Sequence, residues 1–118
     1  MRKTSLALLT LISSSYAIAD GEIYKCDFNT SVIADSSGVY EGRKWESKGF
    51  AIHGDWIIMD SGNLKLKLTR NLSQHGILRG GEPRKGYQFS LEDGKFIYVS
   101  MILPDKGWTI AGTCLPNK

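Results

Sequence analysis

Hydrophobic and polar residues alternate with a period of two along most of the chain beyond residue 20. The clearest case is residues 63–70, NLKLKLTR, where three leucines fall on one face and two lysines and a threonine fall on the other. This alternation is typical of an antiparallel strand with one buried face. Residues 95–103, KFIYVSMIL, are rich in aromatic and β-branched side chains and apolar on both faces at their centre, which predicts a strand in the middle of a sheet.

Other segments repeat this strand pattern, and glycine-containing turns separate them. The strand candidates are residues 21–28, 48–54, 55–59, 86–91 and 108–114. The turn candidates are residues 60–62 (DSG), 92–94 (EDG) and 104–107 (PDKG), in which glycine supplies the positive φ of a short connection. No window of a dozen residues shows an apolar stripe at helical spacing. We therefore predict one all-β domain, a small antiparallel β-barrel or sandwich of seven to eight strands.

The first nineteen residues have the features of a cleaved signal peptide. A positively charged start is followed by a short apolar run, residues 6–12 (LALLTLI), and Ala17 and Ala19 then frame a small-x-small cleavage site. The apolar run is shorter than the roughly 20 residues that a membrane-spanning helix needs. We expect cleavage after Ala19, which leaves residues 20–118 as a single domain in the periplasm or outside the cell.

Cys26 and Cys114 are the two cysteines of the chain, one near each end of the predicted mature domain. Cys26 is not a lipid-anchor site, because Tyr24 and Lys25 precede it and a good cleavage site lies upstream. Neither cysteine has a neighbouring histidine, which disfavours a metal site. In an oxidising compartment an even number of cysteines indicates a disulfide, so we predict a Cys26–Cys114 bridge. It would close a loop of 89 residues, worth about 4.6 kcal/mol on the chain-entropy model.

The charge of the predicted mature domain is nearly balanced. Without Arg2 and Lys3 the chain holds 13 basic and 12 acidic residues, a net charge of +1. This balance does not favour binding to nucleic acid or to an anionic membrane surface. No segment of the domain is apolar over the length of a membrane-spanning helix. We therefore expect the partner to be another envelope or secreted protein.

The sequence shows no arrangement of residues that indicates catalysis or a bound cofactor. His53 and His75 lie in unrelated contexts, and neither belongs to a zinc-protease motif. Asp55 and Asp60 flank the apolar WIIM segment, and alternation puts them on opposite faces of a strand. The nucleophile elbow of serine hydrolases and a phosphate-binding glycine-rich loop before a helix are both absent. We predict a protein that is not an enzyme and that uses no metal and no cofactor.

Residues 79–86, RGGEPRKG, form a basic, glycine-rich segment that we expect to be an exposed loop. Its simplest role is a hairpin connection kept soluble by charge. The functional alternative is a contact loop in which Arg79, Arg84 and Lys85 bind an acidic partner.

Residues 35–42, DSSGVYEG, form a second candidate contact loop, although a plain turn also accounts for their composition. The run Ser37-Gly38-Val39-Tyr40 resembles the Ser-Gly-x-x-Tyr loop of the small β-barrel periplasmic lysozyme inhibitors, being one residue shorter and earlier in the chain. The YKC run at residues 24–26 and the GTC run at 112–114 resemble the cysteine-containing start and end of the same proteins. The resemblance implies that Ser37 and Tyr40 contact a partner from a protruding loop.

Three tryptophans leave an alternative function open. Trp45, Trp56 and Trp108 are of the kind that usually fills a core, but with nearby tyrosines they would line a cavity for one small ligand. The function favoured by the sequence is a non-catalytic periplasmic or secreted binding protein. An inhibitor or immunity-type protein acting on an envelope or cell-wall-directed protein fits this description. The alternative is a lipocalin-like carrier of a small hydrophobic ligand.

Secretion is expected to remove residues 1–19. Intact mass spectrometry of the protein isolated from the periplasm or medium of a bacterial host should give the mass of a chain that begins at Asp20. A mass that includes residues 1–19 would contradict the signal-peptide prediction.

Overall fold

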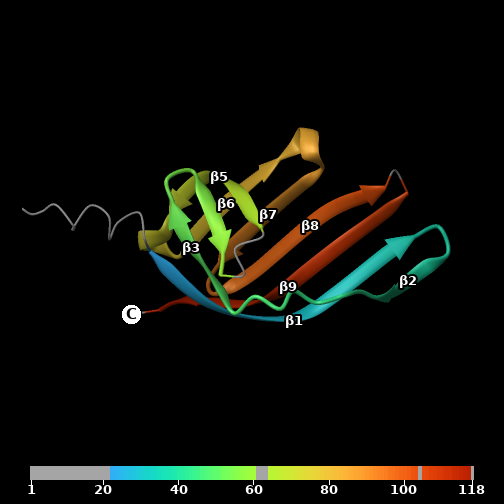
Figure 1. Ribbon diagram of the computed structural model, residues 1–118, viewed down its shortest axis with the longest axis horizontal. Coiled ribbons are helices and arrows are strands. Elements are labelled where there is room, and N and C mark those ends of the chain that lie inside the picture. The colour runs from blue at the N-terminus through green and yellow to red at the C-terminus, as the bar shows by residue number, and fades with distance from the viewer. Residues whose placement is uncertain (1–21, 61–63, 104, 118) are drawn as a thin grey trace, which may run out of the picture.

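The computed structural model describes residues 22–60, 64–103 and 105–117, and the predicted signal peptide lies outside these ranges. Within them the chain forms nine β-strands and two short 3₁₀ turns (Figure 1). The strands are β1 (Ile23–Asp35), β2 (Gly38–Glu41), β3 (Gly49–His53), β4 (Trp56–Met59), β5 (Lys65–Leu72), β6 (Ile77–Glu82), β7 (Tyr87–Glu92), β8 (Lys95–Leu103) and β9 (Lys106–Pro116). The 3₁₀ turns are η1 (Ser73–His75) and η2 (Pro83–Lys85).

Eight of these strands form a closed antiparallel barrel. Around the ring the order is β1-β3-β4-β5-β6-β7-β8-β9, and β1 pairs with β9 to close it. Strand β2 lies outside the ring and pairs with the end of β1. The barrel form of the predicted all-β domain is therefore confirmed, and closure removes the exposed edges that an open sheet would have.

The predicted disulfide is confirmed, and it lies in the strand pair that closes the ring. Cys26 on β1 and Cys114 on β9 lie directly opposite each other. The Cys26 N–H donates to the Lys48 carbonyl oxygen at 2.7 Å and the Cys114 N–H donates to the Gly94 carbonyl oxygen at 2.8 Å. Both N–H groups therefore point away from the other cysteine, so the two cysteines form a non-hydrogen-bonded pair. Side chains that face each other come closest at such pairs of antiparallel strands. Both cysteine side chains are buried.

Alternate residues of the strands point into the barrel and form its core. In β5 the buried residues are Leu66 and Leu68, whereas Lys65 is exposed, so the predicted faces of this strand are confirmed. Aromatic rings form a continuous series of contacts through the interior. The ring-centroid distances are Tyr24–Phe50 4.9 Å, Phe50–Phe96 6.1 Å, Phe28–Phe96 5.4 Å, Phe28–Trp45 5.2 Å and Trp45–Tyr98 4.7 Å. Large rings supply much of the apolar burial that so small a domain needs.

The turn predicted at residues 92–94 is confirmed as a two-residue hairpin connection. Glu92 pairs with Lys95, and Asp93 and Gly94 both have positive φ, 54° and 77°. Positive φ at both central positions is the mark of a type I′ turn, whose twist matches that of the flanking strands. The turn predicted at residues 104–107 joins the Leu103–Lys106 pair, and its Pro104 lies outside the described residues. The turn predicted at residues 60–62 lies mostly outside them as well.

The prediction that residues 79–86 form a loop is wrong for residues 79–82. Residues 79–82 belong to β6 and pair with β7, and only residues 83–86 form the connection between these strands. Gly80 and Gly81 meet close neighbours instead of forming a flexible loop. A Cβ at Gly80 would overlap the Lys67 carbonyl oxygen and the Phe89 ring, and Gly81 has a φ of 147°. Glycine is needed at both positions because neighbouring strands approach closely or the backbone adopts a conformation that other residues avoid.

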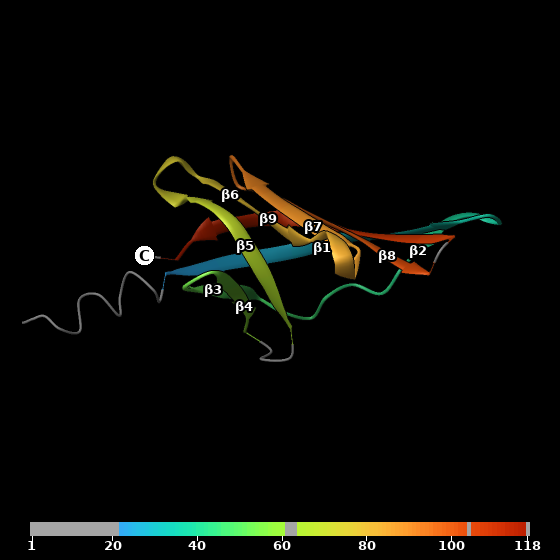
Figure 2. The same ribbon diagram turned by 90° about the horizontal axis from the view of Figure 1, so that it is seen from above.

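Two hairpins extend past the barrel at the end opposite the C-terminus (Figure 1, Figure 2). One consists of the end of β1 with β2, and the other consists of the end of β8 with the start of β9. Because β1 also pairs with β9 here, the four strands form one sheet in the order β2-β1-β9-β8. We call this extension the arm, residues 32–41, 101–103 and 105–109. It stands clear of β3 and β4 in both views.

Removing the disulfide is expected to destabilise the barrel. The bridge joins residues 88 positions apart, and its loss should lower the free energy of unfolding by about 2–5 kcal/mol, as is usual for small secreted domains. Urea unfolding of Cys26→Ala/Cys114→Ala beside the oxidised wild-type protein measures this difference. A loss below about 1 kcal/mol, within the range of ordinary surface substitutions, would show that strand pairing alone closes the ring.

Candidate functional site

The carboxylate of Asp35 holds the turn at the tip of the β1–β2 hairpin. The Ser37 N–H and hydroxyl donate to Asp35 Oδ1 at 2.8 and 2.6 Å. The Tyr40 hydroxyl donates to Asp35 Oδ2 at 2.8 Å. An aspartate that accepts from the backbone two residues ahead forms an Asx turn, which stabilises a tight reversal of the chain. Ser37 and Tyr40, predicted to contact a partner, thus both hold the tip in one conformation.

These hydrogen bonds also change the acidity of Asp35. They favour its charged form, chiefly through the Ser37 hydroxyl and then through the Tyr40 hydroxyl, and lower the pKa of Asp35 to about 2. Lys106 on β9 adds a smaller attraction. The carboxylate is therefore charged, and the tip remains hydrogen-bonded, throughout the ordinary physiological pH range.

One face of the arm carries a row of apolar residues that is exposed at both ends. Val39, Ala34, Gly107 and Met101 are successive cross-strand neighbours on β2, β1, β9 and β8. Val39 is 73% exposed and Met101 is 52% exposed. Two large apolar side chains are thus exposed on one face of the same four-stranded sheet, which makes this face a candidate contact surface.

Ser31 fixes the base of the arm to the barrel. Its side chain is buried, and its Oγ accepts a hydrogen bond from Trp108 Nε1 at 2.8 Å. The same hydroxyl donates to the Arg43 carbonyl oxygen at 2.9 Å. Strands β1 and β9 and the segment after β2 thus meet at one serine. Because a buried polar group left without a partner costs roughly 1–3 kcal/mol, these bonds favour a single position of the arm.

The three tryptophans predicted to line a cavity do not lie together. Trp45 and Trp108 are packed against the core with ring centroids 6.3 Å apart, and the Tyr98 ring contacts both. Trp56 precedes the buried Ile57 on β4, so its side chain lies on the outer face of the barrel. Trp45 and Trp108 therefore belong to the core, whereas Trp56 belongs to the surface.

Trp56 forms one wall of an open groove on this outer surface. The groove has a volume of about 640 Å³ and is lined by Trp56, Lys67, Thr69, Gly81, Glu82, Pro83, Arg84 and Lys85. The Nζ atoms of Lys65 and Lys67 lie 4.6 and 4.9 Å from the Trp56 ring centroid. Two of the predicted binding residues, Arg84 and Lys85, thus share a groove with a tryptophan and a lysine from other strands.

One carboxylate lies among the cations of the groove. Glu82 accepts a hydrogen bond from the Tyr87 hydroxyl at 2.6 Å, and its Oε1 lies 3.7 Å from Lys85 Nζ. Burial, and then the bond to Glu82, raises the pKa of Tyr87 to about 12, so its hydroxyl remains a donor. Lys67 Nζ lies 3.9 Å from Asp55, and Arg84 forms no ion pair within the part of the chain that the structure describes. Lys67 and Arg84 are therefore the cations of the groove that form no ion pair with a carboxylate of the groove itself.

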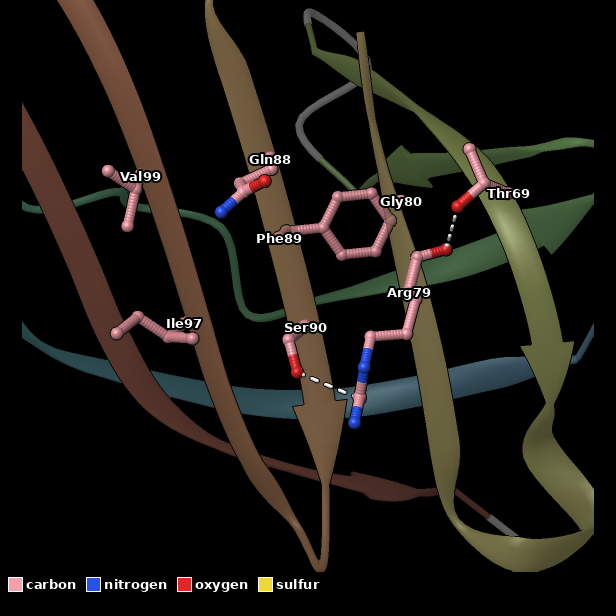
Figure 3. Close-up of a pocket in the computed structure, with 8 residues that line it drawn as sticks. All are labelled: Thr69, Arg79, Gly80, Gln88, Phe89, Ser90, Ile97 and Val99. Atoms are coloured by element: carbon pink, nitrogen blue, oxygen red, sulfur yellow. Dashed lines mark hydrogen bonds between the residues drawn. The ribbon is translucent and has the colours of Figure 1, made fainter. Parts of the chain in front are cut away.

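Arg79, the third predicted binding residue, lines a neighbouring hollow of about 390 Å³. Its guanidinium donates to Ser90 Oγ at 2.9 Å (Figure 3) and to Glu92 Oε1 at 2.6 Å, so its charge is already paired. Thr69 lines both this hollow and the groove. The three predicted cations are thus divided between two adjoining sites.

The histidines do not form a site. His53 lies at the end of β3 and His75 in η1, and both are exposed. Over residues 22–60, 64–103 and 105–117, no three histidine, cysteine, aspartate or glutamate side chains gather as metal ligands do. The same ranges contain no helix long and apolar enough to cross a membrane.

No protein-family model matches the sequence, and no curated protein or solved structure matches the chain. The resemblance of residues 37–40 to lysozyme inhibitors is therefore not extended by any of these comparisons. What can be said of function rests on the arm and the groove.

The acidity of Asp35 predicts a pH dependence of the tip. Because its pKa is about 2 in the folded chain against an ordinary 3.8, the stabilising bonds are fully present above 3.8 and are lost as the pH falls toward 2. An NMR titration of the Asp35 carboxyl carbon should give a midpoint near 2, and Tyr40→Phe should raise that midpoint. A wild-type midpoint at the ordinary value would contradict the hydrogen-bonded tip.

Proposed function

We propose that the protein is a non-catalytic periplasmic or secreted binding protein whose arm contacts another protein. The observation that carries this proposal is the row of apolar residues on one face of the arm, whose two ends, Val39 and Met101, are exposed. Covering such a row removes apolar surface from water, which stabilises a complex. The tip held by Asp35 adds to this, because a pre-ordered surface loses little conformational entropy on binding.

The edge of the arm offers a second means of contact. Strand β2 is the last strand of the sheet, and β1 is its one strand partner within the described residues. One side of β2 therefore presents backbone groups to which a strand of a partner can pair. Side chains such as Val39 would then contribute affinity, while backbone pairing would set the orientation of the two proteins.

The class of partner follows from the predicted compartment. A secreted chain with a disulfide meets proteins of the envelope or the surrounding medium. A narrow projecting hairpin fits a concave surface, and enzyme clefts are the common concave surfaces of proteins. We therefore assign the protein an inhibitory or immunity-type role toward an envelope or cell-wall-directed protein, with Ser37 and Tyr40 at the tip that enters the cleft.

The alternative of a lipocalin-like carrier has less support. A carrier holds its ligand in the barrel interior. Here Trp45 and Trp108 are partly buried and pack against Tyr98 of the core, and the third tryptophan lies on the outer surface. No feature of residues 22–60, 64–103 and 105–117 favours the carrier over the binding protein.

Affinity capture tests the role of the arm. Tagged, oxidised mature protein is exposed to envelope extract and to a panel of purified lysozymes, and the affinity for the captured protein is then measured with purified components. Val39→Ser/Met101→Ser removes two members of the apolar row. We expect this variant to bind the partner at least about tenfold more weakly, because truncated interface anchors typically cost more than 1 kcal/mol each.

A matched control removes exposed apolar surface elsewhere. Ile23 and Leu115 are 50% and 62% exposed and lie at the end of the β1–β9 pair opposite the arm, so Ile23→Ser/Leu115→Ser should bind as the wild-type protein does. Ser37→Ala/Tyr40→Phe should weaken binding by loosening the tip. The absence of any captured protein, or equal affinity of the arm variant and the control, would disprove the proposal.

A further inference from the structure

The groove beside Trp56 forms a second site with a chemistry of its own. We propose that it binds a glycan that carries carboxylate or phosphate groups, with Lys67 and Arg84 as the main anion-binding residues. The groove consists of residues of β4, β5, β6 and η2 and shares no residue with the arm. It adjoins the neighbouring hollow at Thr69, which lines both. The proposal therefore does not depend on the function assigned to the arm.

Two lysines lie against Trp56 before a ligand binds, and one of them, Lys67, lines the groove. Lys65 and Lys67 place their ammonium groups 4.6 and 4.9 Å from the Trp56 ring centroid, which is within the range of a cation–π interaction. A lysine held against an indole ring has less rotamer freedom to lose than one free in water. The contact of Lys67 with Asp55 is long, at 3.9 Å, and largely exposed, so an anion in the groove can compete with it.

The η2 turn places a second kind of cation on another wall of the groove. Pro83 begins the turn and Gly86, with a φ of 76°, ends it, so Arg84 projects from a short and conformationally restricted segment. A guanidinium can donate two parallel hydrogen bonds to one carboxylate or phosphate group. Lys85, by contrast, lies 3.7 Å from Glu82, a carboxylate that itself lines the groove and would repel an anion bound beside it. An anion in the groove therefore has Lys67 and Arg84 available together.

Gly81 contributes backbone alone to the lining of the groove. A Cβ there would lie 2.6 Å from the Tyr87 carbonyl oxygen, so this position excludes a side chain. The volume of about 640 Å³ is within the range of sites that hold small ligands or short polymer segments. Beyond Thr69 the surface continues into the hollow that Gln88 and Ser90 line (Figure 3). A chain-like ligand lying across β5, β6 and β7 would thus meet hydroxyl and amide side chains beside the cations.

These features favour a glycan over a peptide or a nucleic acid. Strands β5, β6 and β7 are paired on both sides, so an extended peptide would find no open backbone edge. A net charge of +3 for the whole chain is small for a protein that binds the phosphate backbone of a nucleic acid. Hydroxyl and amide side chains donate to and accept from sugar hydroxyl groups, and Lys67 and Arg84 complement the anionic ones.

Three polymers with the same sugar backbone separate recognition of charge from recognition of sugar. These are dextran, carboxymethyl dextran and dextran phosphate, each titrated into the oxidised mature protein in a calorimeter. We expect binding to one or both charged polymers and none to neutral dextran. Binding should weaken at high salt, because exposed charges are screened. The charged polymer that binds more tightly identifies carboxylate or phosphate as the preferred group.

Charge-matched variants locate the site. Lys67→Gln/Arg84→Gln should bind the charged polymer at least about tenfold more weakly, because each residue loses a charge-assisted hydrogen bond. The control Lys25→Gln/Lys95→Gln removes the same charge from exposed lysines that do not line the groove, and should bind as the wild-type protein does. Trp56→Ala should weaken binding, whereas Trp56→Phe, which keeps an aromatic ring, should retain most of it. Unfolding midpoints establish that all four variants are folded.

Several outcomes would overturn the proposal. The first is binding to neutral dextran as tight as to the charged polymers. The second is the same loss of affinity in Lys67→Gln/Arg84→Gln as in its control. The third is no binding to any of the three polymers. Tighter binding to poly-glutamate or to a single-stranded oligonucleotide would overturn the assignment of a glycan. The arm variant Val39→Ser/Met101→Ser should bind the charged polymer as the wild-type protein does, so failure at the groove is distinguishable from failure at the arm.

Discussion

The pairing of β1 with β9 is the constraint on which the rest of the structure depends. The two strands come from opposite ends of the described chain, and their register runs from Tyr24–Pro116 to Ala34–Gly107. Without this pairing the strands of the ring would form an open sheet in which β1 and β9 each had one long unpaired side. Bringing such distant segments together carries an entropic cost that grows with the length of the intervening chain, and the Cys26–Cys114 bridge reduces it by holding them together in the unfolded state as well.

The same pairing accounts for the arm. Strands β1 and β9 have 13 and 11 residues, whereas β3 and β4 have 5 and 4, so the long pair has to extend past its neighbours in the ring. The extension becomes the arm, one face of which has no second layer of structure to cover its apolar side chains. The groove, by contrast, lies on the outer surface of the ring, where Gly81 contributes backbone alone to its lining.

Much of the fold could be predicted from alternation and from the cysteines. The strand expected at residues 95–103 has the bounds of β8, and the expected disulfide is present. The length of β1 could not be predicted beyond residue 28. Its register with β9 shifts between Asp27 and Thr30, which leaves Asn29 and Thr30 both exposed and interrupts the period of two. A bulge of this kind depends on the partner strand, so one segment of sequence does not reveal it.

The sites were predictable only where their chemistry is local. Ser37, Tyr40 and Arg84 stand out because turn-forming residues and clustered charges can be recognised within a few positions. The groove joins Trp56 on β4, Lys67 on β5 and the η2 turn, and only the pairing of strands brings these together. Trp56 lies on the outer face because of its position in β4, and composition could not distinguish it from Trp45 and Trp108, which pack against the core.

The first and last described residues of the chain lie close together, which has one more consequence. The Asn117 N–H donates to the Ile23 carbonyl oxygen at 2.9 Å, so the last described residues lie beside the first. A closed ring has no structurally first strand, and its order around the circle is the same wherever the backbone is cut. A chain whose ends were joined by a short linker and reopened at the Asp93–Gly94 turn would keep every strand pair of the barrel. The architecture is thus defined by the cyclic order of its strands, and the same domain can be encoded by circularly permuted sequences.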